Sequence, residues 1–423
     1  MIRRIYLLLI LTVLPTFVLA QIIDEDERLA VYTVNADSVS MESMMADTIV
    51  GNLQLEWPAN IVARLDQLVA HPMFNTSQLG LMVYDLTADS ALYCKNERQM
   101  MRPASILKNI TAITAIDKLG GSYQFRTSLY YYGEIRDNVL NGNLYCVGGM
   151  DPMFGNDDMR AFVESVVRLG VDTIRGMIVA DKSFKDNKEF GEGWCWDDDN
   201  PILSPLLVSG KDVFVEKFEE QLRNFGIVVE TTRSQGCIPN GARVICSRFH
   251  SLDQILMKMM KDSNNLYAES MLYQMAAFGT NAPATAKNAV SYIGNLMRKL
   301  GIKSSSYKIV DGSGLSLYNY VTPELEVMFL RYAYRNSTIF SHLYESLPIA
   351  GVDGTLKKRM TGTFAADNVR AKTGTLTGIT SLAGYCTAAN GHELCFCIIN
   401  QGVLNAKNGR NFQDRVCMAL CRP

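Results

Sequence analysis

The stretch Arg102-Pro-Ala-Ser-Ile-Leu-Lys-Asn-Ile-Thr-Ala-Ile-Thr-Ala-Ile-Asp-Lys-Leu-Gly120 predicts the helix around which this chain folds. Pro103 suits the first turn of a helix, where its missing N–H costs nothing, and Gly120 supplies a stop. Apolar residues between them cover most of the helix circumference, which is typical of a central, buried helix. Ser105 and Lys108 are three positions apart, so they share a face at its start. A hydroxyl beside a buried amine is a candidate nucleophile with its base.

Composition and the N-terminus indicate an exported globular protein. The chain has 423 residues, 48% of them hydrophobic, which suits two or three domains with a sizeable core. The formal net charge of −2 argues against a nucleic-acid partner. The basic head Met1-Ile-Arg-Arg4, an apolar run to Phe17 and small residues at 18–20 predict a signal peptide at 1–20. A retained membrane anchor is the alternative; after signal removal we expect no stable anchor and a periplasmic location.

Cysteines and histidines bear on cross-links and metals. Ten cysteines in an exported chain permit disulfides, and their pairing stays open, although Cys237 and Cys246 flank a turn signal and are the favoured local pair. The chain has four histidines and no Cys-x-x-Cys, so we expect no zinc site.

Residues 21–52 are predicted to be a polar leader. The predicted helices and strands after them fall into two groups, one near the two ends of the chain and one in its middle. A helix at 60–71, a hairpin at 79–95 and strands at 369–372, 380–387 and 394–401 lie near the two ends. These outer elements are expected to form one antiparallel sheet with helices, in a discontinuous domain made of 53–132 and 249–423. Residues 133–248 carry their own strand and helix patterns and are expected to form an inserted, smaller α/β domain.

Three short sequences occur in a set order along the chain: Ser105-Ile-Leu-Lys108, Ser263-Asn-Asn265 and Lys372-Thr-Gly374. Each has a structural explanation when taken alone. A Ser-x-x-Lys match arises roughly once by chance in a chain of this length, Ser and Asn favour helix caps, and the third sequence could be a strand end with its turn. Together, in this order, they are the signature of penicillin-recognising serine acyl-transferases.

The flanking residues carry a closer resemblance, which covers about residues 60–402. The chain resembles the D-alanyl-D-alanine carboxypeptidase/endopeptidase family, low-molecular-mass penicillin-binding proteins with a large insert between the first and second motifs. This resemblance implies an α+β fold with a β-lactamase/transpeptidase-like antiparallel sheet flanked by helices. The stretches that carry it are Arg102–Lys108, Gly149-Met-Asp-Pro152, Gly193-Trp-Cys-Trp-Asp197, Ser263–Glu269, Asp311-Gly-Ser-Gly-Leu-Ser316, Leu347–Leu356 and Ala371–Thr375.

The resemblance implies a catalytic role for five residues. Ser105 would attack the carbonyl of the penultimate D-alanine, and Lys108, kept neutral, would take its proton. Ser263 would relay that proton towards the departing nitrogen. Asn265 would hold the substrate amide and the Lys108 amine, and Lys372 would bind the terminal carboxylate.

The resemblance also implies four substrate-binding positions. Thr373 would assist at the carboxylate, and Gly374 would let the substrate lie along its strand. The N–H of Thr375 would join that of Ser105 in the oxyanion hole. Asp181 is the candidate contact to the third peptide residue, with a plain surface aspartate as the alternative. Leu317 departs from the relatives that carry an arginine near that third residue.

The expected partners are peptidoglycan stem peptides ending in D-Ala-D-Ala, with β-lactam antibiotics as covalent inhibitors and no cofactor or metal. A serine β-lactamase and a non-catalytic peptidoglycan-binding protein on the same scaffold remain alternatives. The residues leave open the balance of carboxypeptidase and endopeptidase activity, the diamino acid of the stem peptide and the oligomeric state.

Overall fold

The structure is a computed structural model that describes residues 55–280 and 282–423. The predicted signal peptide at 1–20 and polar leader at 21–52 lie outside the described residues. Within the described part of the chain, no helix combines the length and hydropathy needed to cross a bilayer.

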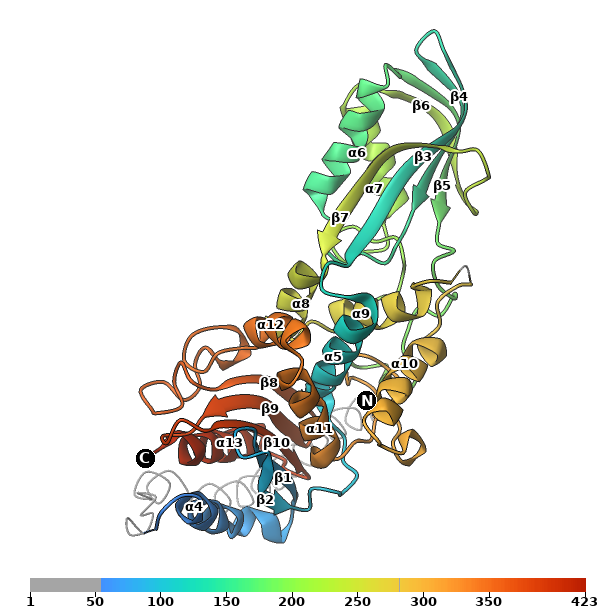
Figure 1. Ribbon diagram of the computed structural model, residues 1–423. Helices are drawn as coiled ribbons and strands as arrows, with labels where there is room; N and C mark the ends of the chain where they lie inside the picture. Colours follow the sequence, from blue (N-terminus) through green and yellow to red (C-terminus); the bar gives the residue numbers. More distant parts are fainter. Residues whose placement is uncertain (1–54, 281) are drawn as a thin grey trace, which may run out of the picture. The chain divides into compact units, whose positions relative to one another are not determined.

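The two ends of the described chain meet in one antiparallel sheet (Figure 1). The first strand of this sheet pairs along its whole length with the last, from Gln78 opposite Gln401 to Asp85 opposite Leu394. This confirms the predicted antiparallel sheet from both ends. The order is β2-β1-β10-β9-β8, with bounds β1 Gln78–Asp85, β2 Ser90–Lys95, β8 Arg370–Leu376, β9 Ile379–Thr387 and β10 Glu393–Gln401.

Both faces of this sheet are covered, because successive side chains of a strand point to opposite faces. In β10, Phe396 packs into a cluster with α4 (Ala59–Val69) and α13 (Ala406–Cys421). The neighbouring Cys397 packs into a second cluster on the other face, built around α5 (Leu107–Leu119). The sheet therefore separates two cores, and β8 is one of its edge strands.

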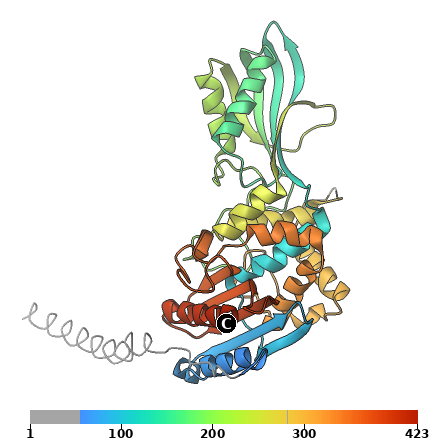
Figure 2. The same ribbon diagram turned by 60° about the vertical axis from the view of Figure 1, so that its left-hand side comes forward.

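Helix α5 is the central helix that the sequence predicts (Figure 2). All residues from Leu107 to Ile116 are buried. Its polar residues find partners inside the core, as when Thr111 Oγ1 donates to the Gly312 carbonyl at 2.7 Å. The helices that pack in the same cluster are α8 (Leu252–Lys261), α9 (Asn265–Ala277), α10 (Ala286–Lys299), α11 (Pro323–Tyr334) and α12 (Ser337–Ser346).

The start of this helix differs from the prediction. Residues 104–106 form a 3-10 turn, and Ala104 has φ +51°, a left-handed conformation that a regular helix start would not need. Tertiary contacts hold this turn: Ser381 Oγ donates to the Pro103 carbonyl at 2.6 Å. Gly314 packs so closely that a Cβ there would lie 1.9 Å from the Ala104 carbonyl oxygen. Ser105 is thus placed by its neighbours rather than by helix propensity.

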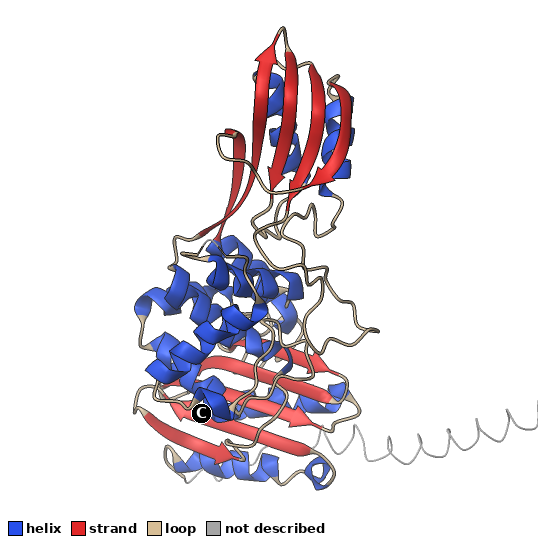
Figure 3. Ribbon diagram, turned by 90° about the vertical axis from the view of Figure 1, so that its right-hand side faces the viewer, coloured by secondary structure: helices blue, strands red, loops and turns tan. Residues whose placement is uncertain are grey.

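A second, mixed five-stranded sheet lies within the middle of the chain (Figure 3). Its order is β6-β5-β4-β3-β7, with bounds β3 Gln124–Arg136, β4 Val139–Val147, β5 Thr173–Asp181, β6 Val228–Gln235 and β7 Arg243–Ser251. Helices α6 (Asn156–Arg168) and α7 (Phe214–Asn224) connect its parallel strands and share its core. Strand β7 was not predicted, because its residues lack an alternating apolar pattern.

The division at 133 and 248 stays a prediction. Strand β3 begins before the proposed insert, and Gln124 pairs with Ser251 at its base. Met150 and Leu203 of the insert belong to the same core cluster as α5. Loops of the segment 133–248 are therefore joined to the core around α5 by packing as well as by the chain.

The favoured cysteine pair is wrong. All ten cysteines lie in the described part of the chain, and all are free thiols. Cys246 lies in β7, whereas Cys237 follows β6, and these two strands are the opposite edges of the sheet. Closeness in sequence does not bring the two sulfurs together, because the sheet order separates their strands.

Candidate active site

The first motif places a lysine against a serine. Lys108 Nζ lies 2.9 Å from Ser105 Oγ, across the junction of the 3-10 turn and α5. The lysine is fully buried. An amine this close to a hydroxyl, without solvent around it, has the geometry of a base and its nucleophile.

The second motif spans the end of the short connection between α8 and α9 and the first residue of α9. Its middle residue, Asn264, caps α9 by accepting from the Tyr267 N–H at 3.3 Å. The helix-cap explanation therefore holds for Asn264 alone, and the side chains of its two neighbours contact the lysines of the other two motifs. Asn265 Oδ1 accepts from Lys108 Nζ at 2.8 Å, and Ser263, at φ +58°, faces the third motif.

The third motif lies on the edge strand β8. Lys372 Nζ donates to Ser263 Oγ at 2.8 Å and to the Thr373 carbonyl at 2.7 Å. Thr373 Oγ1 donates in turn to Thr355 Oγ1 at 2.8 Å. The structure therefore brings these residues into two hydrogen-bonded groups, one of Ser105, Lys108 and Asn265 and one of Ser263 and Lys372. The two groups are neighbours, since the charge of Lys108 acts on Lys372.

Both lysines are shifted towards the neutral amine. Burial lowers the pKa of Lys108 to about 7, partly offset by the negative charges of Asp311 and Glu269. Burial also lowers the pKa of Lys372 well below its usual value, and the charge of Lys108 lowers it further. The repulsion is reciprocal, so the two lysines resist being charged at the same time.

The contacts of Lys108 decide where its lone pair points. A neutral amine has two N–H donors and one lone pair. Two partners can only accept: Asn265 Oδ1 at 2.8 Å and the Ser313 carbonyl at 2.8 Å. When both donors are used there, the lone pair is left for the third neighbour, the Ser105 hydroxyl. Burial therefore favours the neutral amine of Lys108, and its two acceptors direct the lone pair of that amine at the Ser105 hydroxyl.

Strand β8 passes directly against the nucleophile. A Cβ on Gly374 would lie 2.9 Å from the Ser105 nitrogen and 2.2 Å from Ser381 Oγ, so no side chain fits there. Thr375, one position on, is exposed on the same edge strand. Its N–H as an oxyanion donor stays a prediction.

Asp181 lies outside this group. It is 1% exposed at the end of β5. Its carboxylate accepts from Ser183 Oγ at 2.6 Å and from the Ile238 N–H at 2.7 Å. These contacts tie together the loops after β5 and β6. A contact from Asp181 to substrate stays a prediction.

Two buried acids next to the site were missed by the sequence analysis. Glu269 accepts from the N–H groups of Gly312 and Ser313 at 3.0 and 2.8 Å. Burial raises the pKa of Glu269 to about 8, and the nearby Asp311 adds to this effect. The available signal was a lone acid within the apolar pattern of α9, since such a residue needs partners when buried.

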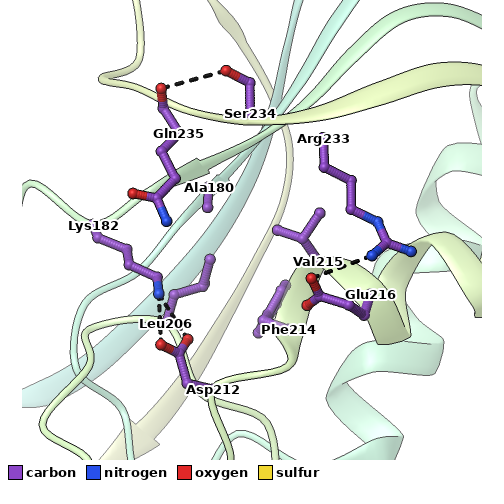
Figure 4. Close-up of a pocket in the computed structure, with 10 residues that line it drawn as sticks. All are labelled: Ala180, Lys182, Leu206, Asp212, Phe214, Val215, Glu216, Arg233, Ser234 and Gln235. Atoms are coloured by element: carbon purple, nitrogen blue, oxygen red, sulfur yellow. Dashed lines mark hydrogen bonds and ion pairs between the residues drawn. The ribbon is translucent and has the colours of Figure 1, made fainter.

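A separate cavity of about 470 Å³ lies at the ends of β5 and β6 in the second sheet (Figure 4). Its charged side chains neutralise one another: Lys182 Nζ donates to Asp212 at 2.7 Å, and Arg233 donates to Glu216 at 3.3 Å. None of the predicted site residues lines it. The group around Ser105 is therefore the better candidate. Among the described residues there is no cluster of three or more His, Cys, Asp or Glu that could hold a metal ion.

Comparison with known proteins finds a family model and several relatives that match this chain. The model of the D-Ala-D-Ala carboxypeptidase 3 (S13) family matches residues 61–210 and 207–421. "Carboxypeptidase Rv3627c" of Mycobacterium tuberculosis is 34% identical over 396 residues, covering 86% of this chain and 84% of the relative. "D-alanyl-D-alanine carboxypeptidase DacB" of Haemophilus influenzae is 26% identical over 405 residues, covering 76% and 84%. The crystal structure of penicillin binding protein 4 (dacB) from Haemophilus influenzae superposes with a TM-score of 0.77 at 24% identity, covering 84% of this chain and 98% of that one.

Proposed function

The chain belongs to the D-Ala-D-Ala carboxypeptidase 3 (S13) family and is a serine-type carboxypeptidase, and we propose that Ser105 carries the acyl group in its reaction. The observation that carries this proposal is the buried Lys108 amine, 2.9 Å from Ser105 Oγ, with both of its N–H bonds directed elsewhere. The proposed substrates are peptidoglycan stem peptides that end in D-Ala-D-Ala.

The acylation step follows from these contacts. Ser105 Oγ attacks the carbonyl carbon of the penultimate D-alanine as its proton passes to the Lys108 amine. The tetrahedral carbon then collapses, the C–N bond breaks, and the nitrogen of the leaving D-alanine receives a proton. Ser263 Oγ, which accepts from Lys372 Nζ at 2.8 Å, is the proposed relay for it. Water later cleaves the ester and restores the Ser105 hydroxyl.

Lys372 is the proposed carboxylate site. Its amine is buried and favours the neutral form when no anion is present. A carboxylate arriving beside it would raise its pKa, because an opposite charge stabilises the ammonium. The enzyme would thus acquire this charge when a substrate with a free C-terminus binds. Thr373 and the open edge of β8 would align the peptide as an added strand, with Asp181 towards the third residue.

Location and partners are part of this proposal. The N-terminal signal pattern supports export and action in the periplasm. The name of the Haemophilus influenzae structure says that this relative binds penicillin. We propose the same covalent inhibition here, because a β-lactam presents an acyl carbon and a carboxylate to the groups at Ser105 and Lys372.

The function is tested by product analysis. Incubation with a defined pentapeptide ending in D-Ala-D-Ala is expected to release D-alanine, with the matching tetrapeptide mass. Cross-linked muropeptides, followed in the same way, report any endopeptidase activity. Nitrocefin should give one burst and little turnover. Steady nitrocefin turnover without D-alanine release would identify a β-lactamase, and neither product nor burst would identify a binding protein.

Acylation is expected to rise with pH through about pH 7. Lys108 must be neutral to act as a base, and its pKa is lowered to about 7. Below that pH the amine is protonated, and the rate should fall about tenfold per pH unit. Stopped-flow labelling with a fluorescent penicillin from about pH 5 to about pH 9 measures this, with circular dichroism as the control for folding. A rate that is flat across this range would contradict Lys108 as the base.

A further inference from the structure

The Ser313 carbonyl is one of the two acceptors that direct the Lys108 lone pair, so the turn that carries it matters for the reaction. Several buried groups hold this turn. Glu269 accepts from the Ser313 N–H at 2.8 Å, and Thr111 Oγ1 donates to the Gly312 carbonyl at 2.7 Å. Asp311 accepts from the Gly314 N–H at 3.0 Å. These contacts belong to the catalytic region itself.

One further contact to this turn comes from the inserted region. Trp194 lies in the loop between β5 and α7, and its Nε1 donates to Asp311 Oδ2 at 3.0 Å. The same loop accepts at the Gly193 carbonyl from the Leu317 N–H, at 3.3 Å. Gly193 lies so close that a Cβ there would come within 2.7 Å of Ser316 Oγ. The loop is therefore fitted against the segment that carries Ser313.

Trp194 shares the Asp311 carboxylate with donors of the catalytic region. Asp311 Oδ2 also accepts from the Ser316 N–H at 2.7 Å, and Oδ1 accepts from Asn319 Nδ2 at 2.7 Å. Asp311 is 1% exposed. Loss of one donor leaves a buried carboxylate oxygen poorly satisfied, which costs free energy, and a turn of the carboxylate towards its remaining donors would relieve that cost. Because Asp311 fixes both sides of the turn, such a rotation would move the Ser313 carbonyl.

We propose that Trp194 is a positioning residue for acylation: through Asp311 it keeps the Ser313 carbonyl where it directs the Lys108 lone pair at Ser105. This proposal rests on the proposed function, since it assumes that Lys108 is the base. It assigns the inserted region a part in the rate of the chemical step. A catalytic region without its insert would retain all five catalytic residues and still acylate slowly.

The test compares two tryptophans of one loop. Trp194→Phe removes the N–H donor and keeps an aromatic ring, whereas Trp196→Phe changes a side chain that is 93% exposed. Labelling rates at several concentrations of fluorescent penicillin separate the dissociation constant from the acylation rate constant. We expect Trp194→Phe to lower the acylation rate constant about tenfold and to leave the dissociation constant unchanged. Trp196→Phe should stay within about twofold of wild type.

Two further readouts separate positioning from a loss of structure. The midpoint of the pH–rate profile should not move in Trp194→Phe, because the substitution removes no charged group. Trp194→His should recover most of the rate, since its Nε2–H takes the place of the indole N–H on a five-membered ring. Circular dichroism melting fixes a temperature at which every variant is folded, and rates are compared there.

The outcomes are distinct. Equal rate constants for Trp194→Phe and Trp196→Phe, or a loss confined to the dissociation constant, would overturn the proposal. Failure of Trp194→His to recover the rate would overturn it as well. If wild-type protein is not acylated at Ser105, the proposed function itself fails, and that result is visible before any tryptophan variant is compared.

Discussion

Ser105→Ala is expected to abolish covalent labelling by penicillin and release of D-alanine. The substitution removes the attacking oxygen and leaves Lys108, Asn265 and Lys372 in place. No acyl-enzyme can then form at this position, and the remaining groups could only favour direct attack by water. We expect a loss of at least about 10⁴-fold in the acylation rate. Gel fluorescence with labelled penicillin, followed by peptide mapping of the adduct, measures it.

The sharpest control for this experiment is the other serine of the site. Ser263 also lies beside a lysine, with Lys372 Nζ 2.8 Å from its Oγ. The site therefore contains two serines that each lie beside a lysine, and each is a candidate nucleophile. Ser105 is favoured because both N–H donors of Lys108 are used by Asn265 and Ser313, which leaves its lone pair for Ser105. Ser263→Ala should still be labelled at Ser105, although slowly. A label that persists in Ser105→Ala and maps to Ser263 would reverse the assignment.

Lys372→Ala is expected to slow acylation by several kcal/mol, or roughly 10²- to 10³-fold. The lysine is fully buried at the edge strand, where its attraction for a carboxylate is little screened. Its removal also leaves Ser263 Oγ without its donor. Stopped-flow acylation with penicillin measures the loss. Lys372→Met, which keeps the apolar volume, separates the loss of charge from the creation of a cavity.

The substrate supplies a second control for Lys372. A penicillin whose carboxylate is esterified should acylate wild type slowly, and Lys372→Ala should slow it little further. This pattern is the coupling expected when the lysine and the carboxylate act on each other. Lys357→Ala, an exposed lysine nearby in the sequence, should behave as wild type. Equal losses with acid and ester would show that Lys372 does not bind the carboxylate.

Local sequence was sufficient to predict the three candidate motifs and the main helices and strands. The spacing of Ser105 and Lys108, the Ser263–Asn265 sequence between two helices and the strand at Lys372 were all readable, because each depends on neighbouring residues. The apolar circumference of α5 likewise predicted its burial, since a helix without a polar face has to be covered. The antiparallel sheet followed from alternating strands at both ends of the chain.

Other features depend on contacts between distant residues. Strand β7 and helices α12 and α13 were not predicted. The sheet order that separates Cys237 from Cys246 is set by strand pairing, which no local pattern states. The left-handed turn at Ala104 is held by close packing of Gly314 and by a hydrogen bond from Ser381, and both residues are more than 200 positions away in the sequence. Propensity alone would have continued the helix.

The amino-acid sequence by itself determined which groups are candidates for the chemistry, because reactivity depends on side-chain type and the motifs keep those types together. The tertiary structure decided how they are oriented. The two acceptors of Lys108 come from α9 and from the turn at Ser313, and Trp194 donates to Asp311 at the start of that turn. The direction of a lone pair depends on where acceptors meet in space, and only the packing of segments far apart in the chain sets that position.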